Sequence, residues 1–268
     1  MRVKEIMDKK HPFIYDDELA TKARAMIRNF ALRILPVVNG NKKLLGIVSR
    51  GNVMAISSSV SPIRVRGIMS TTRHIAAMED DDASTVEKMI RLDEWHVPVV
   101  NSAQDKTYRG VLGLENFIEA SLKANPNKLS KPVSEVMSKN VITCSPDDEV
   151  DNVWRLMQSQ SFAGLPVVKK DKLVGIITQK DLLESGTTLP TFESKKGRFR
   201  ASSTISSIMN TTVIAAKPST RISEVAKLMI SKNIGRIPIK DSNGRLIGIV
   251  DREDVAKQLV KMRREKFE

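Results

Sequence analysis

The sequence predicts a mixed α/β (α+β) protein that uses one unit of about 55 residues four times. Four methionines are each followed, 29 residues later, by a proline within an apolar, mostly β-branched run. After each proline come a polar turn and a Gly-apolar-apolar triplet. The four pairs are Met7/Pro36, Met69/Pro98, Met137/Pro166 and Met209/Pro238. Such constant spacing indicates one structural unit that recurs along the chain.

The first half of each unit reads as a turn, a strand and a helix. An apolar-x-x-apolar-Met turn opens each copy, as at residues 3–7. A strand-like piece follows, such as residues 141–144 in the third copy and its equivalent in the fourth. A helix is expected next, because apolar residues recur three to four positions apart, as at Val150, Val153 and Met157.

The second half of each unit reads as two strands and a closing helix. The proline run predicts the first of these strands, since a proline near a strand start loses little by lacking an N–H. The Gly-apolar-apolar triplet predicts the second strand. Six residues beyond each of these glycines stands an amide or a carboxylate side chain: Asn52, Asn116, Asp181 and Asp254. The predicted order is therefore turn-β-α-β-β-α.

This unit resembles the cystathionine-β-synthase (CBS) domain. The opening Met turn, the Leu-Pro-Val-Val-like strand and the Gly-apolar-apolar-Thr-x-x-Asp ending recur together and in order, and residues 175–181 match the ending best. The resemblance implies that two copies pair through their sheets into one module. It also implies that four copies form two modules in a flat disc, as in the gamma subunit of AMP-activated protein kinase and in archaeal stand-alone CBS proteins.

The repeats and their linkers divide the chain into five segments. Repeats 1 to 3 are expected at residues 1–57, 63–121 and 131–185, and repeat 4, with a basic tail, at 205–268. The connection at residues 186–204 is a basic linker, and long connections in compact domains are usually functional or disordered.

Composition bounds the location of the protein and its class. A chain of 268 residues can hold two domains with proper cores. No run of about 18 apolar residues and no apolar N-terminal signal segment is present, so we expect no membrane partner. The single cysteine, Cys144, fits a reducing cytoplasm, and we expect it to be a buried structural thiol.

The residue pattern predicts a protein that is not an enzyme and that requires no metal. The three histidines, His11, His74 and His96, stand in unrelated contexts, and no Cys/His cluster has the spacing of a metal site. No glycine-rich phosphate loop follows a strand.

The resemblance implies a cleft for an adenine nucleotide (AMP, ADP or ATP) as ligand. In CBS proteins the last Asp of the ending binds ribose hydroxyls, and the Thr or Ser three residues earlier donates to a phosphate. Carried over to repeat 3, this implies Thr178 for phosphate and Asp181 for ribose. Thr143, Gly164 and Pro166 are implied near the adenine.

Repeats 1 and 4 depart from this pattern. Repeat 4 has Asp251 at the phosphate position and Asp254 at the ribose position, and a carboxylate repels phosphate. Its Arg236 stands where related chains carry a phosphate-contacting arginine, which serves either repeat 4 or a neighbouring cleft. Repeat 1 offers Ser49 and Asn52, and an amide binds ribose less strongly than a carboxylate.

Repeat 2 departs furthest, and a structural role competes with ligand binding in every repeat. Gly113 stands where the hydroxyl residue that would donate to phosphate is expected, and His96 is a candidate to compensate for the missing hydroxyl.

An Asp or Asn at a helix start is commonly only an N-cap. We expect Asn52 and Asn116 to be caps, favour ligand binding for Asp181, and leave Asp254 open.

Charge provides a second line of inference. The formal net charge is +13, of which residues 1–60 hold +6 and residues 191–268 hold +9. If the first and last repeats of the disc lie together, they form one basic face. Such a face attracts polyanions and predicts salt-dependent binding of RNA.

Two classes of function therefore remain open: a regulatory protein that binds adenine nucleotides and transmits energy state to a partner, and an RNA- or ribosome-binding protein. A homodimer is compatible with either. The alternative to an RNA interface is a lysine-rich surface that is only solvated and ion-paired. The residues predicted to contact RNA are Lys195, Lys196, Arg198, Arg200, Lys261, Arg263 and Arg264.

Overall fold

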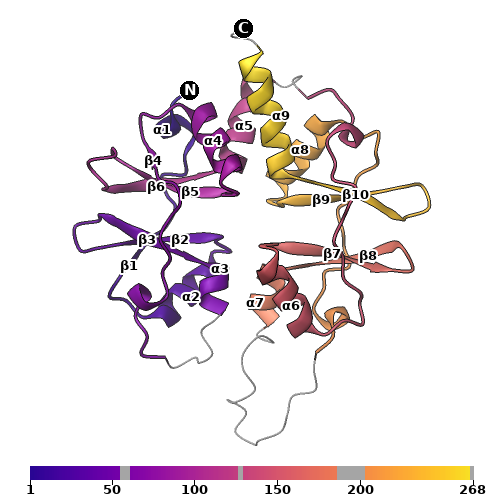
Figure 1. The fold of residues 1–268 in the computed structure, drawn as a ribbon, viewed down its shortest axis with the longest axis horizontal. Helices are drawn as coiled ribbons and strands as arrows, with labels where there is room; N and C mark the ends of the chain where they lie inside the picture. The colour runs from indigo at the N-terminus through magenta and orange to yellow at the C-terminus, as the bar shows by residue number, and fades with distance from the viewer. Residues whose placement is uncertain (55–60, 126–128, 186–202, 266–268) are drawn as a thin grey trace, which may run out of the picture.

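The computed structural model describes residues 1–54, 61–125, 129–185 and 203–265. Viewed down its shortest axis, the molecule shows the four repeats at the four corners of a disc (Figure 1). Repeats 1 and 2 form one side of the disc, and repeats 3 and 4 form the other. The predicted fold class and the flat disc are thus confirmed.

Repeats 1 and 2 each contain a short opening helix, three strands and two longer helices. Repeat 1 comprises α1 (Val3–Ile6), β1 (Ile14–Tyr15), α2 (Ala20–Asn29), β2 (Ile34–Val38), β3 (Leu44–Ser49) and α3 (Arg50–Met54). Repeat 2 comprises η1 (Val65–Gly67), β4 (Ala76–Ala77), α4 (Asp82–Arg91), β5 (His96–Val100), β6 (Tyr108–Gly113) and α5 (Leu114–Ala124). In both, the first strand pairs parallel to the second, which pairs antiparallel to the third.

Repeats 3 and 4 follow the same order with two-stranded sheets. Repeat 3 comprises η2 (Val133–Glu135), α6 (Val150–Ser159), β7 (Gly164–Lys169), β8 (Lys172–Thr178) and α7 (Gln179–Ser185). Repeat 4 comprises η4 (Ile205–Ser207), α8 (Ile222–Ser231), β9 (Arg236–Lys240), β10 (Leu246–Asp251) and α9 (Arg252–Arg264). The two strands of each sheet are antiparallel.

The first strand predicted in repeats 3 and 4, at residues 141–144 and 213–216, is wrong as a strand. Each is reduced to a single parallel bridge. In repeat 1 the strand continues because Asp16 donates its N–H to the carbonyl at the end of β2 at 3.0 Å. Pro146 and Pro218 stand at the equivalent positions, nine residues after the repeated methionine. Since proline has no N–H, the ladder ends one residue earlier.

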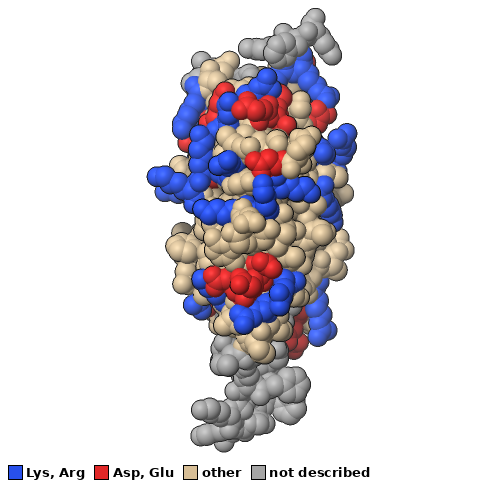
Figure 2. Space-filling view, turned by 90° about the vertical axis from the view of Figure 1, so that its left-hand side faces the viewer, with Lys and Arg blue, Asp and Glu red and all other residues tan. Residues whose placement is uncertain are grey.

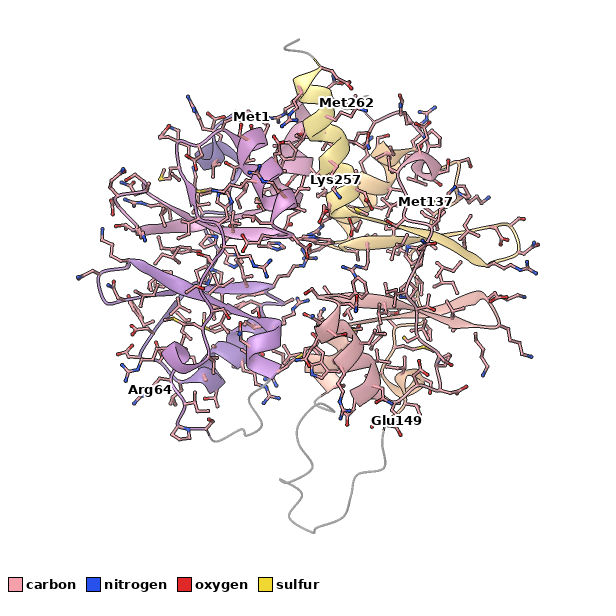
Figure 3. All side chains as sticks on the ribbon, viewed as in Figure 1. Met1, Arg64, Met137, Glu149, Lys257 and Met262 are labelled. Carbon is pink, nitrogen blue, oxygen red and sulfur yellow. The ribbon has the colours of Figure 1, made fainter. Side chains whose placement is uncertain are left out.

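The recurring glycine and methionine mark the places where paired repeats touch. A Cβ on Gly110 would lie 2.4 Å from the carbonyl oxygen of Asp8, so only glycine lets repeat 1 approach β6. A Cβ on Gly248 would lie 2.6 Å from the sulfur of Met137. Figure 3 places Met137 beside the β9–β10 hairpin, although this methionine belongs to repeat 3. The recurring glycine and methionine therefore lie at the contact between the two repeats of one module.

Paired repeats also exchange their opening turns. Val3 of repeat 1 and Val65 of repeat 2 are both fully buried. Val3 lies in the apolar core of repeat 2, and Val65 lies in the core of repeat 1. Val133 and Ile205 are exchanged between repeats 3 and 4 in the same way. Each repeat therefore needs its partner to complete its core.

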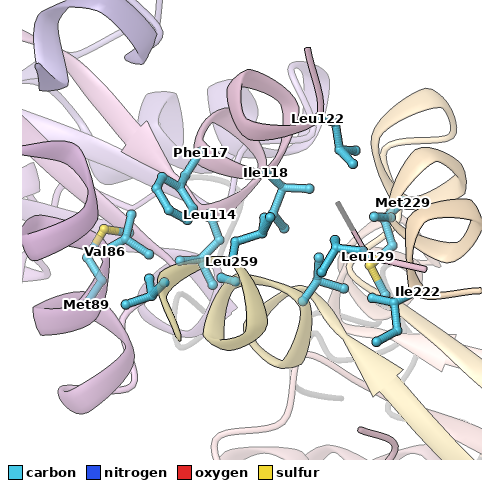
Figure 4. Close-up of a cluster of buried hydrophobic side chains, with 14 of the residues drawn as sticks. Val86, Met89, Leu114, Phe117, Ile118, Leu122, Leu129, Ile222, Met229 and Leu259 are labelled. Carbon is cyan, nitrogen blue, oxygen red and sulfur yellow. The ribbon is translucent and has the colours of Figure 1, made fainter. Parts of the chain in front are cut away.

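The two modules are joined through their helices. One continuous core unites repeats 2 and 4, where α4 and α5 pack against α8 and α9. Figure 4 shows this core, with Phe117 and Ile118 from α5 facing Leu259 of α9. A second core unites repeats 1 and 3, through α2 and α3 on one side and α6 and α7 on the other.

This pairing separates repeats 1 and 4, which were expected to lie together. Helix packing sets repeat 1 against repeat 3 and repeat 2 against repeat 4, so repeats 1 and 4 lie at opposite corners of the disc (Figure 1). On the side formed by repeats 1 and 2, Lys and Arg are interspersed with Asp and Glu (Figure 2). The two most basic repeats therefore do not lie side by side at one edge of the disc.

Two further expectations concern the core and the membrane. Cys144 is buried, as expected, and burial together with Asp148 raises the pKa of its thiol to about 12. Within the described ranges, none of the helices has the length and apolar character needed to cross a membrane.

Candidate functional site

The residues predicted for repeat 3 meet at one end of its sheet. Gly164, the first residue of β7, pairs directly with Thr178, the last residue of β8. Pro166 lies two residues further along β7 and accepts the N–H of Cys144 at 3.1 Å. Thr143, the neighbour of Cys144, is half-buried. The chain thus brings a hydroxyl, a glycine and a proline around one sheet end, which the spacing alone did not show.

Asp181 and Thr178 bind one another at the start of α7. The backbone N–H and the hydroxyl of Thr178 donate to Asp181 Oδ2 at 2.8 and 2.6 Å, and the N–H of Asp181 reaches Thr178 Oγ1 at 3.3 Å. The two residues therefore form a reciprocal helix cap. Both bonds that the Asp181 carboxylate accepts use Oδ2, and Oδ1 of Asp181 is a second acceptor on the same carboxylate.

A cap of the same kind recurs in each other repeat, although in repeat 2 glycine offers no side chain for the return bond. Asn52 accepts the N–H and hydroxyl of Ser49, both at 2.8 Å, and donates to Ser70. In repeat 2, Asn116 accepts the N–H of Gly113 at 2.8 Å. Asn52 and Asn116 thus make structural bonds at a helix start, as expected, but each is the third residue of its helix and accepts the N–H of the preceding N-cap residue, so neither is itself the N-cap.

Repeat 4 places two carboxylates together at its cap. Asp254 accepts the N–H of Asp251 at 2.9 Å, while Asp251 accepts the N–H groups of Glu253 and Asp254. Burial, followed by the charge of Asp251, raises the pKa of Asp254 to about 7. Burial also raises the pKa of Asp251. The pair therefore retains a proton more readily than isolated carboxylates do.

Arg236 reaches the cleft of repeat 3 from repeat 4. It donates a hydrogen bond to the carbonyl of Gly164. Its guanidinium also lies 5.5 Å from the ring centroid of Trp95, in repeat 2. Burial lowers the pKa of Arg236, and Asp251 counteracts this. Of the two possibilities left by the sequence, the structure thus shows Arg236 at the neighbouring cleft.

A charge cluster at the centre of the disc joins three repeats. Glu115 of α5 accepts a bond from His96 at 2.8 Å and one from Arg252 at 2.9 Å, and it lies 3.7 Å from Arg33. His96 was a candidate to replace the phosphate hydroxyl of repeat 2, but here it binds Glu115. Sequence reasoning missed Arg33, Glu115 and Arg252. A usable signal was that Arg33 stands directly before the strand of the repeated proline.

The candidate RNA-binding residues separate into two groups. Lys195, Lys196, Arg198 and Arg200 lie outside the described residues. Arg263 pairs with the buried Asp82 at 2.6 Å and lies 4.7 Å from the ring centroid of Phe117.

Two further tail residues are also paired. Lys261 lies 4.0 Å from the carboxylate of Glu265, and Arg264 forms an ion pair with Glu87. They line a groove between α4 and α9 that also contains these two glutamates. The described part of the tail is thus largely ion-paired.

No cluster of three or more His, Cys, Asp and Glu side chains in the described ranges is arranged to hold a metal ion.

Comparison with known proteins matches this architecture. The chain is 28% identical over 280 residues to protein MJ1225 of Methanocaldococcus jannaschii, covering 96% of this chain and 98% of the relative. The crystal structure of MJ1225, a proposed archaeal homologue of g-AMPK, superposes with a TM-score of 0.84 at 24% identity, covering 96% and 99%. A conserved protein from Pyrococcus horikoshii superposes with a TM-score of 0.67 at 23% identity, covering 97% and 100%.

An enzyme is similar over part of its length. Inosine-5'-monophosphate dehydrogenase of M. jannaschii is 31% identical over 192 residues, which cover 67% of this chain but 36% of the enzyme. The family model of the CBS domain matches residues 3–59, 133–186 and 205–261, and repeat 2 shares their order of elements. The chain therefore belongs to the CBS domain family.

Proposed function

We propose that this protein is a non-enzymatic regulatory protein that binds an adenine nucleotide in the cleft of repeat 3 and transmits energy state to a partner protein. The observation that carries the proposal is the convergence of four groups at one sheet end. Thr178 ends β8 and Asp181 begins α7, Gly164 pairs with Thr178, and Arg236 approaches from repeat 4. A hydroxyl, a carboxylate and a guanidinium are the groups that a nucleoside phosphate requires.

Each group has a chemical role in this proposal. The Oδ1 atom of Asp181 accepts a ribose hydroxyl, while Oδ2 keeps the helix cap. Binding of a phosphate turns the Thr178 hydroxyl away from Asp181, and Arg236 supplies the positive charge. Gly164 lets β7 approach the end of β8 closely, since a Cβ there would lie 2.9 Å from the carbonyl oxygen of Ile177 and 3.0 Å from Cγ2 of Thr178.

The position of Arg236 also suggests how binding is transmitted. This residue belongs to repeat 4, bonds to repeat 3 and stacks on Trp95 of repeat 2. A ligand that draws Arg236 toward a phosphate changes the contacts among three repeats. Such a ligand shifts the equilibrium between two arrangements of the modules. The shift is limited to the difference between its binding free energies for the two arrangements.

The proposal is tested by titrating AMP, ADP, ATP and adenosine into the purified protein by calorimetry. We expect at least one nucleotide to bind with one or more sites per chain, and adenosine to bind more weakly because it lacks the charge that Arg236 recognises. Absence of binding at millimolar concentrations of all three nucleotides would overturn the proposal.

RNA or ribosome binding remains the second candidate function, supported by the net charge of +13. Purification at low salt followed by mass spectrometry and RNA analysis separates the candidates. Co-purified AMP, ADP or ATP without RNA supports the nucleotide proposal. Ribosomal RNA that is lost as salt rises supports the second candidate, because phosphate contacts release counterions.

A further inference from the structure

The centre of the disc holds a carboxylate that the proposed nucleotide cleft does not use. Glu115 lies in the first turn of α5 in repeat 2. Its Oε1 is 2.8 Å from Nε2 of His96 and 3.7 Å from Arg33, and its Oε2 is 2.9 Å from Arg252. A carboxylate only accepts hydrogen bonds, so Nε2 of His96 carries the proton. Cations from repeats 1 and 4 and the imidazole of repeat 2 therefore surround one anion.

The carboxylate of Glu115 occupies space that a side chain fills in the other repeats. A Cβ on Gly113 would lie 2.6 Å from Cδ of Glu115 and 2.7 Å from both of its carboxylate oxygens. Ser49, Thr178 and Asp251 stand at the equivalent position in repeats 1, 3 and 4. Glu115 thus turns back into the place left by the missing side chain of residue 113.

The environment of Glu115 is built for a negative charge. The side chain of Arg252 is 1% exposed and that of His96 is 8% exposed. Arg252 also donates to Asn233, which fixes its orientation. Burial would raise the pKa of Glu115, but His96, Arg252 and Arg33 together hold it well below its usual range. An unpaired cation at this depth is strongly unfavourable, so the cluster requires an anion.

We propose that Glu115 is a built-in anion that fills the phosphate position of repeat 2 and closes this repeat to phosphate. Removal of its charge leaves Arg33, His96 and Arg252 as a site for inorganic phosphate or for the phosphoryl group of a nucleotide. The inference rests on the proposed function only for the equivalence of Gly113 and Thr178. The residues of this site do not include Asp181 or Thr178, so the two proposals fail separately.

The test is calorimetric titration of inorganic phosphate into wild-type protein and the Glu115→Ala variant, in a buffer free of other multivalent anions. We expect the variant to gain one phosphate site per chain, with an affinity at least tenfold above any binding by wild type at this centre. Glu119→Ala is the matched control, because Glu119 lies on the same helix and pairs only at the surface with Lys123. It should behave as wild type does.

A second set of variants keeps the test decisive. The added site should disappear in the double variant Glu115→Ala, Arg33→Ala and persist when Asp181→Ala is combined with Glu115→Ala. If Glu115→Ala does not fold, Glu115→Gln keeps the shape, and phosphate should raise its melting temperature more than that of wild type. Equal phosphate binding by wild type and the charge-removed variants, or a site that survives loss of Arg33, overturns the inference.

Discussion

The candidate sites of repeats 2 and 3 have the same backbone arrangement and differ in the side chain at the last residue of the strand, Gly113 in repeat 2 and Thr178 in repeat 3. In both, a strand ends beside the residue two before the repeated proline, and an Asn or Asp three residues on caps the next helix. Repeat 3 presents a hydroxyl, with Arg236 close by. Repeat 2 has glycine there, and Glu115 fills the space.

This difference separates the structural role of the frame from its chemical role. The caps are the same kind of bond in both repeats, so they explain why Asn116 and Asp181 stand at equivalent positions without any ligand. The charged group beside the cap differs. In repeat 3 it is the guanidinium of Arg236, and in repeat 2 it is the carboxylate of Glu115. We therefore expect the neighbours of the cap, rather than the cap itself, to decide which of these sites binds phosphate.

The largest expected effect comes from comparing Asp181→Ala with Asn116→Ala. Each variant should lose about 1 kcal/mol of stability, because each loses a helix cap. Only Asp181→Ala should weaken nucleotide binding, by about 100-fold, since only repeat 3 is proposed to hold ribose. Urea unfolding and calorimetric titration measure the two effects. Equal nucleotide affinity in the two variants would show that Asp181 is a cap alone.

The next effect is expected when a hydroxyl side chain is restored to repeat 2. The φ of Gly113 is −107°, which any residue adopts, so strain of the backbone does not oppose threonine. Gly113→Thr should nevertheless cost about 2 kcal/mol, because its Cβ displaces Glu115 from His96 and Arg252.

A double-mutant cycle with Glu115→Ala sharpens this prediction. We expect the two substitutions to be strongly non-additive in urea unfolding, because either one already removes Glu115 from its place. Additive losses would mean that Glu115 does not occupy the space of the residue 113 side chain.

A smaller effect is expected from Arg236→Ala, which removes the cation of repeat 3. The affinity for AMP should fall about tenfold, while the affinity for adenosine should change little, since guanidinium recognises the phosphate. Lys227→Ala is a suitable control, because it removes an exposed cation from α8 of the same repeat. An equal loss for AMP and adenosine would assign Arg236 to packing rather than to phosphate.

The smallest effect extends the comparison to repeat 4 and depends on pH. The pKa of Asp254 in the folded protein is raised to about 7, so between about pH 4 and this value the folded state binds more protons than the unfolded state. Stability from this group should therefore fall as pH rises through that window.

Asp254→Asn should flatten this dependence by an amount on the order of 1 kcal/mol between pH 5 and pH 8. Urea unfolding at the two pH values measures the change. If the variant keeps the pH dependence of wild type, the pKa of Asp254 is not raised in the folded protein.

The cap residues show how far a sequence pattern reaches. The resemblance to the CBS domain pointed to Thr178 with Asp181 and to Ser49 with Asn52 as site residues, and their separation of three positions allows each pair to form a cap. It did not identify Glu115 as the partner of His96, since the bond depends on the absence of a side chain at Gly113. At residues 141–144 only a bridge at Cys144 remains, because Pro146 lacks the N–H that would extend the ladder by one residue.

The sequence by itself determined the four repeats and the order of their helices and paired strands, apart from the first strand of repeats 3 and 4, because these features follow from periodicity and short spacing. Only the tertiary structure decided that repeat 1 faces repeat 3, that Arg236 bonds to Gly164 of repeat 3, and that Arg252 and Glu115 meet at the centre. Arg252 and Glu115 are 137 positions apart. Contacts of that kind depend on how apolar helix faces pack between modules, and no local pattern encodes them.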